Sequence, residues 1–187
     1  MEHLQYPIGR FSAQTNYTAK EIQALITTME RSPERYHTLL LPLTEQELAK
    51  TYRSGSWTVR QLLHHVADVH MLNFLRIKKT LTEENYIATT IEMNAWALTS
   101  DSLTAPVDYS LLMLEGINKR FVYVVKSMSE EDFSKSYYHP VRQMQFDLRQ
   151  AVHMAVWHLE HHQAHIELAL GLTPHKFNLE QVAETIN

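Results

Sequence analysis

Four long segments with the apolar spacing of an amphipathic helix constrain the fold of this chain more than any other feature. Only four of the 187 residues are glycine, which argues against an all-β fold built from tight turns. Apolar side chains instead recur every three to four residues, as on the buried face of a helix. We predict an all-α fold, a four-helix bundle, with residues 1–187 in a single domain. The predicted helices span Ala19–Leu41, Thr58–Leu81, Asp108–Met128 and Asp147–Leu170.

Capping residues mark the ends of two of these helices. Thr58 is followed three residues later by Gln61, and Asp147 by Gln150. This is the spacing of a capping box, in which the two side chains satisfy free backbone N–H groups at the start of a helix. Gly171 suits the position just after the fourth helix, where the backbone turns left-handed.

Three other segments are predicted to depart from regular helix. Ser32 and Pro33 interrupt the first helix, and Ser32 caps the part that continues to Leu41. Helical spacing fades over residues 82–106, which predicts a long crossover connection. Residues 133–146 are predicted to be irregular or briefly extended.

Composition narrows the class of protein. The net charge is only -4 and no basic stripe occurs, so we expect no nucleic-acid partner. No apolar stretch is long enough for a membrane span, and residues 1–7 lack the basic and apolar regions of a signal peptide. The chain has no cysteine, which excludes disulfides, thiolate ligands and a cysteine nucleophile. We predict a cytoplasmic protein that acts on a small molecule.

Histidine is the unusual residue type: the chain has 12, and five lie between His153 and His165. Imidazole binds divalent first-row metals well, and two residues four apart on a helix project from one face. His158 and His162 form such a pair at the flank of the apolar stripe of the fourth helix. We therefore expect both side chains to reach the interior of the bundle.

The second predicted helix offers a third ligand. His65 borders the apolar stripe of that helix, whereas His64 lies almost opposite to it. His65, His158 and His162 would make a three-ligand, open site of the kind that catalytic metals use. The other histidines on the two helices are interpreted as solvated or dimer-contacting: His64, His161 and His165.

Other interpretations of these residues remain open. An i,i+4 histidine pair is only moderately specific by itself. A diiron-carboxylate site needs paired Glu-x-x-His motifs, but Glu160 is followed at that spacing by Gln163. Asp68, one turn after His65, is predicted to orient an imidazole of the site, with a solvated helix charge as the alternative. Three residues are left open between pocket roles and core or surface roles: Asn73, Arg76 and Trp96.

Five segments carry a further signal that is specific only in combination: residues 6–11 (YPIGRF), 57–68 (WTVRQLLHHVAD), 96–97 (WA), 139–140 (HP) and 157–166 (WHLEHHQAHI). In these segments the chain resembles the DinB-like superfamily, and within it the YfiT branch of metal-dependent hydrolases. The resemblance implies a DinB-like metal-binding helical domain whose ligands fall on His65, His158 and His162. It also implies a homodimer, with zinc as the first candidate metal and nickel as the second. The chain departs from the family at Leu159, where a small residue is usual, which affects packing rather than the ligands.

A site of three neutral imidazoles leaves a divalent metal strongly Lewis acidic. Such a metal lowers the pKa of a bound water to about 7 in the best-known zinc case. The resulting hydroxide could attack an ester or amide, which predicts a metal-dependent hydrolase with no protein nucleophile and no assignable general acid. Some DinB-like proteins resemble metal-dependent thiol S-transferases that use a low-molecular-weight thiol such as bacillithiol, which is the first alternative. A non-catalytic metal-binding module is the second.

Overall fold

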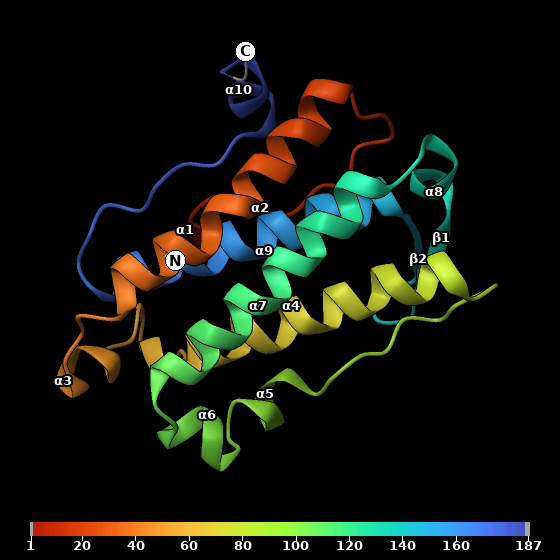
Figure 1. Ribbon diagram of the computed structural model, residues 1–187. Coiled ribbons are helices and arrows are strands. Elements are labelled where there is room, and N and C mark those ends of the chain that lie inside the picture. Colours follow the sequence, from red (N-terminus) through yellow and green to blue (C-terminus); the bar gives the residue numbers. More distant parts are fainter. Residues whose placement is uncertain (1, 186–187) are drawn as a thin grey trace.

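Four long helices form the body of the molecule (Figure 1). The computed structural model describes residues 2–185. The long helices are α2 (Ala19–Leu40), α4 (Val59–Thr82), α7 (Val107–Ser127) and α9 (Leu148–Ala169). Helices α7 and α9 each pack against both α2 and α4, so the predicted four-helix bundle is confirmed.

Shorter elements join and flank these helices. The segment predicted to be irregular or extended forms an antiparallel hairpin, in which Tyr137 pairs with Phe146. The shorter elements are α1 (Glu2–Gln5), α3 (Glu45–Leu48), α5 (Met93–Trp96), α6 (Ser100–Thr104), α8 (Glu130–Ser134), β1 (Ser136–His139), β2 (Met144–Asp147) and α10 (Leu179–Glu184).

The long crossover makes α4 and α7 parallel neighbours. Near the start of both helices, His64 Nδ1 lies 2.7 Å from Ser110 Oγ. Farther along both, the Phe74 and Phe121 rings pack with their centroids 5.6 Å apart. The connection over residues 83–106 therefore returns along the length of α4 before α7 begins (Figure 1). Two short helices, α5 and α6, lie within this connection.

Helix α2 continues through Pro33, so the predicted interruption at Ser32 and Pro33 is wrong. Proline has no N–H to donate to the carbonyl oxygen of Met29, four residues earlier. Asn118 of α7 replaces that donor, because its side-chain Nδ2 lies 2.9 Å from Met29 O. Both groups are buried, and the helix stays intact because its neighbour satisfies the carbonyl.

The predicted capping residues hold the helix ends in place. Thr58 with Gln61 and Asp147 with Gln150 both form capping boxes. Gly171 has a φ of 77° and follows the C-cap of α9, a conformation that costs glycine little. These caps fix where α4 begins and where α9 begins and ends, and so they fix the positions of the histidines along each helix.

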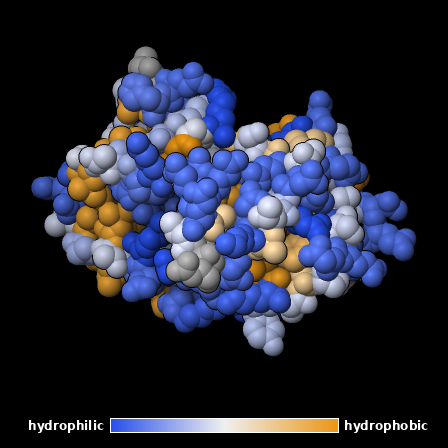
Figure 2. All heavy atoms as spheres, turned by 90° about the horizontal axis from the view of Figure 1, so that it is seen from above, coloured by the Kyte–Doolittle hydropathy of each residue, from blue (hydrophilic) through white to orange (hydrophobic). Residues whose placement is uncertain are grey.

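The molecular surface is mostly hydrophilic. Figure 2 shows one face, on which hydrophobic residues gather mainly at the end where α2 ends and α3 lies. Leu41, just after α2, is 61% exposed. No helix among residues 2–185 has the length and apolar character needed to cross a membrane.

Candidate metal centre

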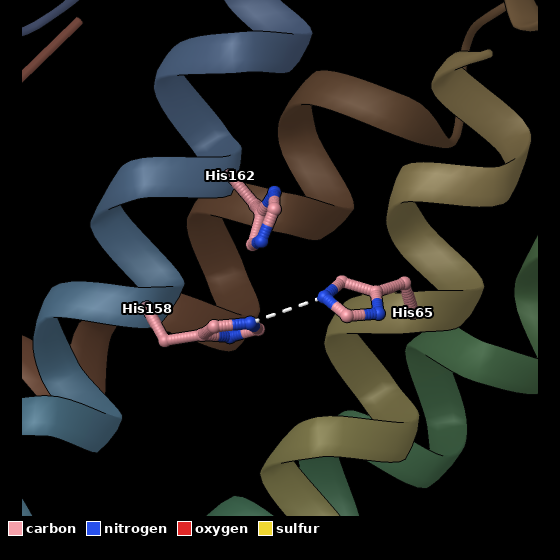
Figure 3. Close-up of side chains that lie close together, drawn as sticks. All are labelled: His65, His158 and His162. Atoms are coloured by element: carbon pink, nitrogen blue, oxygen red, sulfur yellow. Dashed lines mark hydrogen bonds between the residues drawn. The ribbon is translucent and has the colours of Figure 1, made fainter. Parts of the chain in front are cut away.

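His65 of α4 and His158 and His162 of α9 face one another between the two helices (Figure 3). The Nε2 atoms of His65 and His158 are 3.2 Å apart. One ring nitrogen from each of the three residues lies within 4.8 Å of the others. Nitrogens bound at about 2.0–2.1 Å to one tetrahedral zinc ion lie about 3.4 Å apart, which is close to the His65–His158 separation. The structure thus brings together the three residues predicted as ligands.

The three imidazoles lie in a protected environment. Burial lowers the pKa of His65 to about 4. Burial, together with the neighbouring histidines, lowers the pKa of His158 and of His162 well below 6.5. All three rings are therefore neutral at pH 7, as metal ligands must be. The facing Nε2 atoms of His65 and His158 can share only one proton between them, which leaves the facing ring nitrogen of His162 without a partner among residues 2–185. A single cation between the three rings would accept a lone pair from each of them.

His165 lies behind His162 and orients it. Its Nε2 is 3.2 Å from the carbonyl oxygen of Gln5, and its Nδ1 is 3.4 Å from Nδ1 of His162. A carbonyl only accepts hydrogen bonds, so the proton of His165 is on Nε2 and its Nδ1 accepts. His162 then donates from Nδ1 and keeps its lone pair on Nε2. A hydrogen bond of this kind is the usual support of a metal-bound histidine.

The histidines predicted to be solvated or dimer-contacting are buried within the chain itself. His64, His161 and His165 are 5%, 6% and 3% exposed. The His161 ring stacks on Trp157, with centroids 4.4 Å apart, and the His165 ring stacks on Tyr52 at 4.0 Å. Tyr6, whose ring centroid lies 5.9 Å from that of His161, and Tyr52 belong to segments far from α9 in the sequence, so the pattern of a single helix gives no sign of this burial.

A second histidine cluster overlaps the first. His161, His162 and His165 also place ring nitrogens within 4.8 Å of one another. All three come from α9, and His162 belongs to both clusters. The contact between His162 Nδ1 and His165 Nδ1 occupies a nitrogen of each residue. The cluster that joins α4 to α9 is therefore the better candidate for a metal centre.

Nearby carboxylates take no part in the three-histidine cluster. Asp68 forms no side-chain hydrogen bond to any histidine in residues 2–185, so its predicted orienting role is wrong. Burial and the neighbouring Asp101 raise the pKa of Asp68 to about 6. Glu160 is paired with Arg35 of α2, away from the cluster. The site therefore offers only neutral nitrogen donors, which leaves the full charge of a bound metal uncompensated.

The first of two cavities beside the cluster has a volume of about 330 Å³ and is lined in part by His158. We call it the arginine cavity, because Arg76 of α4 and Arg142 of the hairpin turn line it. Asn73, left open by the sequence, also lines it, whereas Trp96 lines neither cavity. Sequence reasoning missed Arg142 as a pocket residue. The only signal near it was the His-Pro segment at residues 139–140, which fixed no role.

The second cavity is lined in part by His162 and has a volume of about 290 Å³. We call it the tyrosine cavity, because Tyr6 and Tyr52 line it, and Arg53 and Trp57 lie in its wall. The Trp57 ring also tilts over His65, with centroids 4.7 Å apart. Each of the two α9 ligands therefore borders a separate space that can receive a small molecule.

The chain belongs to the DinB superfamily, whose family model matches residues 28–166. A Bacillus pumilus protein named "Putative metal-dependent hydrolase" is 41% identical to it, over 89% of this chain and 94% of that protein. A Halalkalibacterium halodurans relative with the same description is 37% identical, over 89% and 96%. YfiT from Bacillus subtilis has a similar structure, with a TM-score of 0.86 and 31% identity over 91% of this chain and 99% of that one.

The structure of YfiT is described as that of "a probable metal-dependent hydrolase with an unusual four-helix bundle topology". The resemblance inferred from the sequence is therefore confirmed, as is the fold that it implied. The names of the relatives imply a metal ion. The neutral, largely buried histidine cluster of this chain fits such an ion by its donor set and spacing.

Proposed function

We propose that this protein is a metal-dependent hydrolase that binds a divalent ion through His65, His158 and His162. Zinc is our first candidate and nickel the second, because both accept imidazole nitrogens. The observation that carries the proposal is the cluster of three neutral imidazoles, two buried and one (His158) half-buried, of which His158 and His162 border cavities. The descriptions of the relatives support the same activity.

When bound, the metal would supply Lewis acidity and activate water toward an ester or amide. The chain itself contributes position and protection. His165 holds the tautomer of His162, and Trp57 shields one side of His65. Hydrolysis adds one water across the carbon–oxygen or carbon–nitrogen bond, with no covalent intermediate on the protein. We further propose that the chain works in the cytoplasm as a homodimer of single-domain subunits, without nucleic-acid or membrane partners.

Metal content and its dependence on one ligand test this proposal. Purified protein should contain about one divalent ion per chain by elemental analysis. His158→Ala removes a ligand and should lower zinc affinity by two orders of magnitude or more. His153→Asn is the matched control, because His153 is a buried histidine on the same helix that instead lies 2.9 Å from the Tyr17 hydroxyl. Equal zinc affinity in His158→Ala and the wild type would contradict the proposed centre.

A second candidate function is metal-dependent thiol transfer, and the two cavities favour it. His158 borders one cavity and His162 the other, so an electrophile and a thiol could approach the centre from separate sides. The chain has no cysteine, so the thiol would be a small molecule. In transfer, the thiol loses its proton, its sulfur bonds to the electrophilic carbon, and the leaving group departs with the electron pair.

Zinc-loaded protein incubated with a panel of esters, amides and alkyl halides separates these functions. Hydrolysis without added thiol supports the hydrolase. Product that forms only with a thiol such as bacillithiol or N-acetylcysteine, and carries its sulfur, supports transfer and contradicts hydrolysis. No reaction in either arm, with metal bound, supports a metal-binding module.

A further inference from the structure

The arginine cavity contains positive charge that its surroundings do not balance. Arg76 is only 8% exposed, and Arg142 reaches the same cavity from the hairpin turn. The lining contains no aspartate or glutamate. Within residues 2–185 neither guanidinium contacts a carboxylate, and the Arg142 guanidinium hydrogen-bonds only to the Met154 sulfur, at 3.9 Å.

Neutral groups position Arg76 without neutralising it. Its Nε and Nη2 donate to the carbonyl oxygen of Thr89 at 3.3 and 2.8 Å, and its Nη1 donates to Asn73 Oδ1 at 3.0 Å. A guanidinium has five N–H groups, so about two remain for another acceptor. A buried charge is costly unless it is paired. The missing counter-charge therefore points to an anionic ligand.

His139 lies in the same wall, within reach of the charges of both arginines. Burial, followed by the charges of Arg76 and Arg142, lowers the pKa of His139 to about 4. The two guanidiniums thus lie close enough to act on the same neutral imidazole. His158 lines the same cavity as Arg76 and Arg142, which places the positive charge beside the three-histidine cluster.

We propose that Arg76 and Arg142 bind the anionic group of the substrate, a carboxylate or a phosphate. This inference rests on the proposed function, because it places the reactive bond of the same molecule at the three-histidine centre. Guanidinium suits both anions because its parallel N–H groups match their oxygen pairs. Apolar side chains supply much of the remaining wall, so the substrate is a small organic anion with an apolar body. Those side chains include Val69, Leu72, Ile91 and Val141.

Three probes with the same six-carbon body test the charge requirement: hexanoate, hexyl phosphate and the neutral hexanamide. Calorimetric titration should show saturable binding of one or both anions to zinc-loaded protein, and at least tenfold weaker binding of hexanamide. The anion that binds more tightly identifies the group that the site accepts. The same titration on metal-free protein distinguishes anion binding by the arginines from anion binding by the metal. Binding that persists without metal does not depend on the proposed metal centre.

Two substitutions and a matched control locate the anion. Arg142→Gln should weaken binding of the preferred anion about tenfold or more, as expected for loss of a charged hydrogen bond. Arg76→Gln should weaken binding in the same way if this variant folds. If it does not fold, Arg142→Gln still tests the proposal, because Arg142 is exposed and its substitution does not disturb the core. Arg53→Gln is the control, because Arg53 lies in the tyrosine cavity, and it should leave the affinity unchanged.

Four results would overturn the proposal. The first is binding of hexanamide as tight as that of the anions, and the second is no saturable binding of either anion. The third is loss of binding in Arg53→Gln but not in Arg142→Gln, which would place the anion in the tyrosine cavity. The fourth is anion binding that is lost in metal-free protein but is unchanged by Arg142→Gln, which would place the anion on the metal alone. Failure to bind zinc, with anion binding intact, would contradict only the metal centre.

Discussion

At the scale of single residues, the support that His165 gives to His162 makes a direct prediction. His165→Ala removes the acceptor for the His162 Nδ1 proton and should weaken zinc binding about 10- to 100-fold. His165→Asn places an amide oxygen near the position of the lost Nδ1, so it should restore most of the affinity. Competition with a chromophoric chelator measures both values.

His161→Ala is the control for this series. It removes a neighbouring buried ring that stacks on Trp157 and makes no hydrogen bond from its Nδ1. We expect its zinc affinity to stay within about threefold of the wild type. The residues that tune a metal site are those that hydrogen-bond to its ligands, and His161 makes no such bond in the described part of the chain. A loss as large as that in His165→Ala would instead favour the second histidine cluster as the metal site.

For single residues, the sequence predicted which histidines meet better than it predicted which side chains are buried. Helical geometry and the family resemblance both selected His65, His158 and His162, because a helix fixes the direction of each side chain relative to its own apolar stripe. The same geometry was wrong about the burial of His161 and His165. A stripe describes one helix, whereas burial depends on whichever other segments pack against it.

At the scale of secondary-structure elements, the contact between α7 and the proline of α2 is testable. Asn118→Ala leaves the buried carbonyl of Met29 without a donor, which should lower the free energy of unfolding by about 1–3 kcal/mol. In a Pro33→Ala background the backbone N–H of residue 33 can satisfy that carbonyl. Asn118→Ala should therefore cost less there, and urea unfolding of the four proteins measures the difference.

An equal cost of Asn118→Ala in both backgrounds would show that the amide does not substitute for the missing N–H. The sequence could not predict this compensation. Pro33 is a strong signal to end a helix, and residues 29 and 118 are distant in the chain. By contrast, the starts of α4 and α9 were predictable, since a capping box lies within four consecutive residues.

At the scale of the whole molecule, buried histidines should make the protein sensitive to acid. His70 is 1% exposed, and burial lowers its pKa from 6.5 to about 4. Between pH 6.5 and 4, His70 is therefore protonated in the unfolded chain but stays neutral in the folded chain. The stability due to this residue is complete above pH 6.5 and is lost as the pH falls toward 4.

From pH 6.5 to 5, His70 should account for about 1.6 kcal/mol of lost stability, because the slope rises toward its limit of about 1.4 kcal/mol per pH unit as the unfolded chain becomes protonated. His70→Leu removes the titrating group, so its free energy of unfolding should fall less over that range than that of the wild type. Urea unfolding of metal-free protein is the measurement, since metal release would add its own pH dependence. Equal slopes in the two proteins would contradict the prediction.

The sequence by itself determined the four helices, most of their ends and the three histidines that meet between α4 and α9. These features depend on periodicity and on caps, which act over a few neighbouring residues. Only the tertiary structure decided that Pro33 is tolerated, that His161 and His165 are buried, and that Arg76 and Arg142 share a cavity. Each of these outcomes needs a partner from a distant segment, and local pattern carries no information about which distant segments pack together.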